Sequence, residues 1–246
     1  MKKMIAALLA LVMVFSLAAC GEKSDDTQVP DDNTSVVTPT EENNEDQGSD
    51  SEEDQAQLPV AGDLTVEALR KHPETPADQF IYSECLDQDG LRIDQYIGTD
   101  DIVVVPAEID GRSVVDIAVV CFGNDSIVRG IVLPESIKYV HEVFINNANL
   151  ELVIAEGLEI VGFGLFTNCA NLREVVLGDN VTAIEESAFG SCLSLEKLNI
   201  PATLTEMTDA EIITSFYSTP LVTIYCEAGS YIEQVAIDHQ IPYVNE

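Results

Sequence analysis

The sequence predicts a solenoid of stacked coils built from short parallel β-strands with little helix, preceded by a disordered acidic tether. Two observations predict the solenoid. Segments with matching apolar patterns begin 22, 22 and 23 residues apart, and such a period indicates one supersecondary unit that buries its apolar face against the next copy; the starts are Val128, Leu150, Leu172 and Leu195. The charge of the residue after each start also alternates along the stack. The tether follows from a polar, acidic stretch between residues 22 and 57.

Each predicted coil contains one inward-facing strand. Leu172, Val175 and Leu177 have the L-x-x-L-x-L spacing of such a strand, and Val181 and Ile184 recur after a turn. The later stretch "SAFGSC" places Phe189 and Cys192 at the positions that Phe166 and Cys169 hold one coil earlier, and Phe144 matches the phenylalanine of the coil before. The repeated apolar residues are therefore expected to form the core.

An upstream segment from Asp100 fits the same frame when an insertion near Asp110 and Gly111 is allowed. The repeats then span residues 100–207 and form about five coils, of which the last is incomplete. Three coils are roughly the minimum for a stable stack.

The residues after the coil starts provide a second test of the alignment. Neighbouring strands lie roughly 4.8 Å apart, so opposite charges at these positions would form a ladder worth about 0.2 to 1 kcal/mol per pair. The alternating residues are Asp101, Arg129, Glu151, Arg173 and Glu196.

The pattern P-x-x-[VI]-x-x-I-x-x-x-A-F-x-x-C-x-x-L over residues 100–207 resembles the BspA-like leucine-rich repeats of bacterial surface proteins. This resemblance implies a leucine-rich repeat solenoid. The chain departs from the pattern at Leu165 and Val143, which replace the Ala before Phe, and in "TDAEIITSF", which makes the final coil the least regular.

The flanks are expected to cap the solenoid, with an N-terminal cap at residues 63–99 and a C-terminal cap at 208–246. In the first cap, "GDLTVEALRKHP" predicts a short helix with Asp63 as N-cap and Pro73 as the stop. The turn at Asp89-Gly90 predicts a β-hairpin. Helix and hairpin are both expected to cover the open first coil.

The N-terminus has the pattern of a secretory signal peptide at residues 1–19, with Lys2 and Lys3 before a short apolar run. Its end, "LAAC", resembles the lipobox of bacterial lipoproteins, which implies cleavage before Cys20 and acylation of that thiol. The alternative is an ordinary signal in which Cys20 is incidental. Residues 20–62 would then be a disordered tether, and the protein would be an extracytoplasmic, membrane-anchored lipoprotein at the cell surface.

Composition argues against several classes of function. The formal net charge is -33, with 44 acidic residues against 11 Lys and Arg, which opposes binding of nucleic acid through phosphates.

The motif "DQDG" at residues 87–90 does not fit a calcium loop, because the first ligand position would be Cys85 and the twelfth Tyr96. No catalytic constellation, metal site, cofactor site or small-molecule substrate is predicted. A Cys169–Cys192 disulfide is geometrically possible, but both residues are expected as small apolar side chains in the core.

One surface stands out as a candidate binding site. The residue between the last two inward positions of each strand should face outward, and it is apolar in four coils; these residues are Val104, Val132, Ile154 and Val176. Such a stripe can mark a partner site, although β-branched residues also suit exposed strands. The leading hypothesis is a non-catalytic protein-interaction or adhesion module. The alternatives are an envelope spacer without a specific ligand and, more remotely, a solute-binding or enzymatic lipoprotein.

Overall fold

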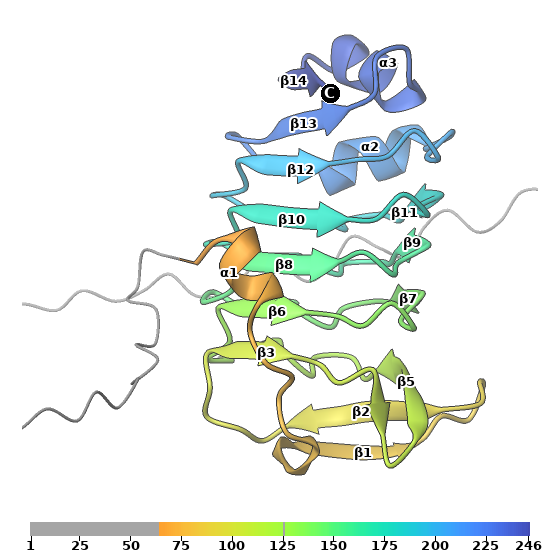
Figure 1. Ribbon diagram of the computed structural model, residues 1–246. Helices are drawn as coiled ribbons and strands as arrows, with labels where there is room; N and C mark the ends of the chain where they lie inside the picture. The colour runs from red at the N-terminus through yellow and green to blue at the C-terminus, as the bar shows by residue number, and fades with distance from the viewer. Residues whose placement is uncertain (1–63, 125) are drawn as a thin grey trace, which may run out of the picture. The chain divides into compact units, whose positions relative to one another are not determined.

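The computed structural model describes residues 64–124 and 126–246, and the predicted signal peptide, Cys20 and the predicted tether lie outside these residues. A seven-stranded parallel sheet runs along the stack, one strand per coil, in the order β14-β13-β12-β10-β8-β6-β3 (Figure 1). Its strands are β3 (Ile102–Val104), β6 (Gly130–Val132), β8 (Leu152–Ala155), β10 (Glu174–Leu177), β12 (Lys197–Asn199), β13 (Thr223–Cys226) and β14 (Tyr243–Asn245). The predicted fold class, a leucine-rich repeat solenoid of parallel strands, is confirmed.

The solenoid is longer than the five coils that the repeat pattern indicated. The segment expected as a C-terminal cap adds β13 and β14 to the same sheet, with Lys197 paired to Thr223 and Ile224 paired to Tyr243. Helix α3 (Tyr231–Asp238) connects these two strands. The spacing of 22 or 23 residues is lost in this part of the chain, because α2 (Asp209–Ser215) precedes β13 and α3 precedes β14.

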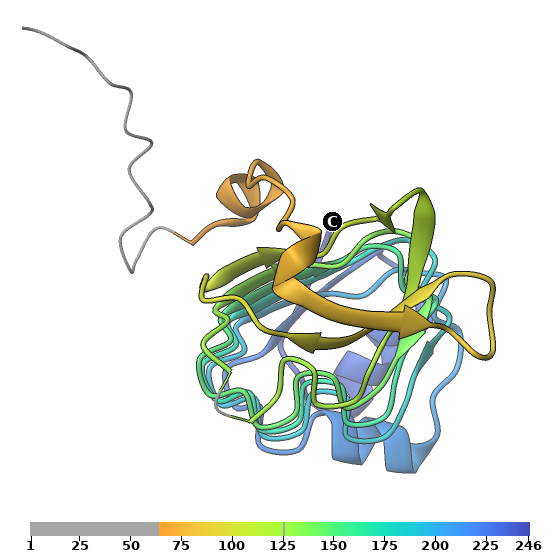
Figure 2. The ribbon, with the colours of Figure 1, turned by 90° about the horizontal axis from the view of Figure 1, so that it is seen from below.

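A second parallel sheet, in the order β11-β9-β7, follows another side of the coils. Its strands are β7 (Tyr139–Val140), β9 (Ile160–Val161) and β11 (Ala183–Ile184). Viewed along the stack, the middle coils superimpose closely (Figure 2). Each of these coils turns its corner at a residue with positive φ, and these residues are Val120, Glu142, Gly164 and Ser187.

A ladder of stacked phenylalanines fills the core. The rings of Phe122, Phe144, Phe166, Phe189 and Phe216 follow one another at centroid distances of 5.9, 5.3, 5.4 and 6.4 Å. Phe216 belongs to the irregular final coil, where α2 (Asp209–Ser215) replaces the turn of the earlier coils. The capping box of Thr208 and Glu211 fixes the start of this helix. The sequence departs from the repeat there, but the ring still reaches the ladder.

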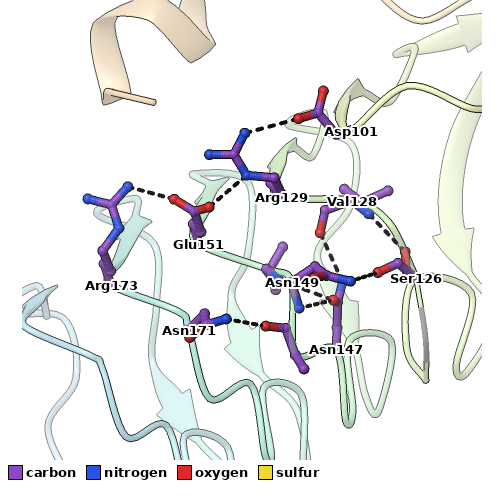
Figure 3. A network of polar contacts seen from close by, with 11 residues as sticks. Asp101, Ser126, Val128, Arg129, Asn147, Asn149, Glu151, Asn171 and Arg173 are labelled. Atoms are coloured by element: carbon purple, nitrogen blue, oxygen red, sulfur yellow. Dashed lines mark hydrogen bonds and ion pairs between the residues drawn. The ribbon is translucent and has the colours of Figure 1, made fainter. Parts of the chain in front are cut away.

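The predicted charge ladder is present over its first four members (Figure 3). Arg129 contacts Asp101 at 3.1 Å and Glu151 at 2.6 Å, and Arg173 contacts Glu151 at 2.9 Å. The ladder does not extend to Glu196, which forms no ion pair with Arg173 within the described part of the chain. In the next coil Lys197 pairs with Glu174 at 3.0 Å instead.

The first coil is covered by the predicted hairpin, whose strands are β1 (Phe80–Glu84) and β2 (Leu91–Tyr96). Strand β2 pairs with β5 (Arg112–Ile117), which in turn pairs with β4 (Glu108–Ile109). A 3₁₀ turn, η1 (Ala77–Gln79), leads into β1.

The predicted helix forms, but its expected place on the first coil is wrong. Helix α1 (Val66–Arg70) lies over β6 and β8 on the outer face of the seven-stranded sheet (Figure 1). The N-cap is Thr65 and not Asp63 as predicted, with the Thr65 hydroxyl accepting from the Ala68 amide at 3.2 Å. After α1, the Thr75 backbone and hydroxyl bond to Val104 and close the free edge of β3. The helix goes to the sheet because the hairpin already buries the end of the stack.

Replacing Phe166 with Ala should destabilise the domain by about 3 to 5 kcal/mol, the usual cost of removing a fully buried phenylalanine. Its ring contacts both neighbours in the ladder, so the cavity cannot close from one side. Urea denaturation followed by circular dichroism measures the loss. Phe163→Ala, in the same coil but 47% exposed, is the matched control and should cost less than about 1 kcal/mol. Equal losses in the two variants would contradict the ladder as the main source of stability.

Replacing Arg129 with Met should cost roughly 1 kcal/mol at neutral pH, because it removes the cation that pairs with Asp101 and leaves Glu151 with Arg173 alone. Partial burial raises the pKa of Glu151, but hydrogen bonds from Arg129 and Arg173 outweigh it, so the pKa is lowered. A lowered carboxyl pKa stabilises the fold above the pKa of the unfolded chain, and this contribution is lost as pH falls through the folded pKa.

The difference in unfolding free energy between Arg129→Met and the wild type should therefore shrink in acid. Urea titrations at neutral and acid pH measure it. Lys71→Met removes only an exposed i,i+4 pair with Glu67 and should cost no more than about 0.5 kcal/mol. A penalty for Arg129→Met that is independent of pH would show that packing, not charge, explains its effect.

Candidate interaction surfaces

The four residues of the predicted stripe lie in register on adjacent strands. Val104 pairs with Val132, Val132 with Ile154, and Ile154 with Val176. Parallel pairing in register aligns side chains on one face of a sheet. The four residues therefore form the continuous column that the repeat alignment predicted.

The stripe is less open than expected, because α1 covers its middle. Ile154 is only 2% exposed and packs in one small apolar cluster with Leu64, Leu69 and Leu152. Val132 and Val176 are partly buried against this cluster. The expectation of an exposed column is thus wrong for Ile154. Repeat spacing gave no sign of this cover, since α1 lies outside the repeats.

Two features hold α1 on the sheet. Gly130 leaves room for the helix, because a Cβ at this position would lie 3.1 Å from Leu64 Cδ1 and 3.3 Å from Leu69 Cδ1. At the other end, both guanidinium nitrogens of Arg70 donate to the carboxylate of Glu156 at 2.7 and 2.8 Å. The glycine and the bidentate pair together fix the helix over β6 and β8.

A second outward column, which the sequence reading missed, follows the corner between the small sheet and the phenylalanine ladder. Its members lie three positions before the ladder residues, and we refer to them as the corner stripe: Val119, His141, Phe163, Glu186 and Ile213. Val119, Phe163 and Ile213 are 48%, 47% and 61% exposed. The residue types differ from coil to coil, so this column becomes visible only when the ladder sets the register.

Tyr139 widens the corner stripe into an aromatic surface. Its ring lies 5.6 Å from that of His141 and crosses β9, where Gly162 has no side chain to block it. Its hydroxyl donates to Glu185 Oε2 at 3.2 Å, and the Phe163 amide donates to the same oxygen at 2.6 Å. These two bonds hold the Glu185 carboxylate beside the exposed rings.

Every lysine and arginine of the described residues is paired with a carboxylate. The eight are Arg70, Lys71, Arg92, Arg112, Arg129, Lys138, Arg173 and Lys197. Residues 64–246 contain 30 Asp and Glu, so most carboxylates have no cation of their own. The surface therefore offers negative charge and no free positive charge in the described region.

Cys169 and Cys192, two of the free cysteines in the described region, lie in the core. Their thiols donate to the carbonyls of Phe144 and Phe166 at 3.1 Å. Burial raises the pKa of Cys192 to about 12 and that of Cys169 well above its usual value, whereas a reactive cysteine needs a lowered pKa. His72, His141 and His239 lie on different parts of the fold.

Within residues 64–124 and 126–246, no group of three or more His, Cys, Asp or Glu side chains is arranged to hold a metal ion. None of the helices in these ranges combines the length and apolar character required to cross a membrane.

Comparison with known proteins agrees with this architecture. The model of the "BspA type Leucine rich repeat region" matches residues 108–236 in six copies. Among solved structures, the chain is similar to the leucine-rich repeat protein of T. pallidum, with 26% identity and a TM-score of 0.54, covering 62% of this chain and 71% of that one. No curated protein matches the sequence.

The chain is also similar in fold to a leucine-rich cell surface protein from Faecalibacterium prausnitzii, with 20% identity and a TM-score of 0.54. That match covers 65% of this chain and 41% of the other. The family match extends over more than half of the sequence and contains the strands β6, β8, β10, β12 and β13. The chain belongs to the BspA-type leucine-rich repeat family.

Proposed function

We propose that this protein is a non-catalytic interaction or adhesion module, tethered to the cell envelope through a lipid on Cys20. The observation that carries the proposal is the regular column on the sheet, where Val104, Val132, Ile154 and Val176 stand in register on neighbouring strands. Solenoids commonly bind partners on such extended surfaces. The core beneath the column is closely stacked, so the outward side chains have fixed positions.

The contact with α1 supports this use of the sheet face. Leu64 and Leu69 already pack on it, which demonstrates that the face accommodates apolar side chains from a separate segment. Val176 on β10, at the edge of this contact, is only partly buried. We assign the binding role to this partly exposed end of the column, while Ile154 under the helix supports α1.

The lipoprotein part of the proposal depends on the sequence. The "LAAC" motif at residues 17–20 and the acidic stretch to residue 62 have the order of an anchor followed by a spacer. A spacer of about 40 residues spans roughly 35 Å as a random coil, and repulsion between its carboxylates would extend it. Multiple acyl chains would bind a bilayer durably, whereas one chain would not.

Lipidation predicts that the expressed protein incorporates labelled palmitate and fractionates with membranes. Cys20→Ser should abolish the label and release the protein from the membrane fraction, because the acylated thiol is lost. Cys85→Ser, at the hairpin, is the matched control and should retain both properties. A Cys20→Ser variant that still carries the label would contradict anchoring at this residue.

Binding at the sheet face predicts a saturable partner in cell-surface extracts. Val176→Lys should weaken that binding at least tenfold, because it places a charge at the partly exposed end of the column. Leu86→Lys is the control, since Leu86 is 94% exposed on the hairpin turn, and it should bind like the wild type. Thermal unfolding confirms that the variants are folded. If no saturable partner binds the folded wild-type chain, the spacer hypothesis replaces this proposal.

A further inference from the structure

The corner stripe has three apolar members, Val119, Phe163 and Ile213, that no other part of the described chain covers. Exposed apolar surfaces that continue over several elements mark interaction sites more often than single exposed residues do. Val119, Phe163 and Ile213 are each about half exposed or more. They come from alternate coils, with His141 and Glu186 at the coils between, and each lies three positions before a ring of the stacked ladder.

The charges around the corner stripe select the chemistry of its partner. Glu186 lies within the column, Glu142 adjoins His141 in the sequence, and Glu185 is fixed beside Phe163 by the Tyr139 hydroxyl and the Phe163 amide. Because every described lysine and arginine is already paired, no cation is available for an acidic partner. Carboxylates next to aromatic rings favour a partner that brings both cations and apolar side chains.

The same charge pattern disfavours two other occupants. A second copy of this chain would bring carboxylates against carboxylates with no free cation between them, which opposes association. An anionic lipid surface attracts clusters of Lys and Arg, and the corner stripe has none.

The geometry of the column favours a helix over an extended peptide. Successive coils lie roughly 4.8 Å apart, so the column from Val119 to Ile213 is about 19 Å long. An α-helix advances about 5.4 Å per turn, so one apolar side chain per turn meets one coil. Side chains on one face of an extended strand lie about 6.6 Å apart. This spacing is longer than the distance between coils, so the strand loses its match to the coils within two coils.

We propose that the corner stripe is a docking surface for a basic amphipathic helix of a partner protein, about 13 residues long. The apolar face of this helix lies along Val119, His141, Phe163 and Ile213, and its lysine or arginine side chains contact Glu142, Glu185 and Glu186. This proposal rests on the proposed interaction function but uses a different face from the sheet column, so the two can fail separately.

The test uses a synthetic 18-residue peptide of Leu and Lys with all Leu on one helical face. A peptide of the same composition in scrambled order is the first control, and a Leu and Glu peptide with the same pattern is the second. Fluorescence anisotropy with the chain from Gly21 to Glu246, which contains every described residue, should give saturable binding of the amphipathic basic peptide. The scrambled peptide should bind at least tenfold more weakly, and the acidic peptide should not bind.

Two variants test whether the peptide binds at the corner stripe. Phe163→Ser removes an apolar contact and Glu186→Lys reverses a charge, and each should weaken binding at least tenfold. Their matched controls are Leu86→Ser on the hairpin turn and Glu135→Lys at an exposed turn of another side, both of which should stay within twofold. Circular dichroism verifies that each variant is folded.

Several outcomes would overturn the proposal. Equal weakening by Glu186→Lys and Glu135→Lys would show attraction by net charge alone, and unchanged binding in both stripe variants would place the peptide elsewhere. If sedimentation velocity shows that the wild type is a dimer and Phe163→Ser a monomer, the occupant is a second copy of the chain. Binding to vesicles of phosphatidylglycerol and phosphatidylcholine that Phe163→Ser abolishes would identify a lipid surface. A cell-surface partner lost with Val176→Lys but kept with Phe163→Ser would retain the proposed function and reject the corner stripe.

Discussion

The structure depends on one constraint, namely that five successive coils each place a phenylalanine ring against the ring of the coil before. Between Phe122, Phe144, Phe166 and Phe189 the chain uses 22, 22 and 23 residues, but it uses 27 to reach Phe216. The longer connection contains α2, whose Ile212 packs into the core, and the ring still stacks at 6.4 Å. Stacked repeats gain stability from nearest-neighbour contacts, so the ring position is fixed while the outer loop varies in length. The same freedom allows outward positions to differ from coil to coil.

The pairing of the few Lys and Arg side chains within the chain determines the charge of the surface. Arg129 and Arg173 alternate with Asp101 and Glu151 across the strands, and Arg70 holds α1 to Glu156. Each of these cations stabilises a contact within the chain. The remaining carboxylates set the field that a partner meets, which favours association with basic molecules and repels acidic ones. Interactions that hold the fold together therefore also decide which class of partner can approach.

The sequence predicted those features that repeat with the period of the coils. In the middle coils the strands, the phenylalanine positions and the alternating charges recur every 22 or 23 residues, so alignment of the coils was enough to find them. The position of α1 could not be found in this way, because it depends on the missing side chain of Gly130 and on a pair between Arg70 and Glu156, 86 residues apart. The corner stripe was hidden for another reason. Its residues are valine, histidine, phenylalanine, glutamate and isoleucine, which share a position but no chemical type.

The two apolar columns differ in a way that bears on their roles. The column on the sheet lies partly under α1, and its buried member, Ile154, shares a cluster with Leu64 and Leu69. A partner that needs the whole sheet column must first displace a helix held by a bidentate ion pair. A partner at the corner stripe displaces no described segment of the chain. Glu185 beside the stripe is already oriented by two hydrogen bonds. Preorganised groups lose less freedom on binding, so the corner can bind a short basic helix while α1 remains on the sheet.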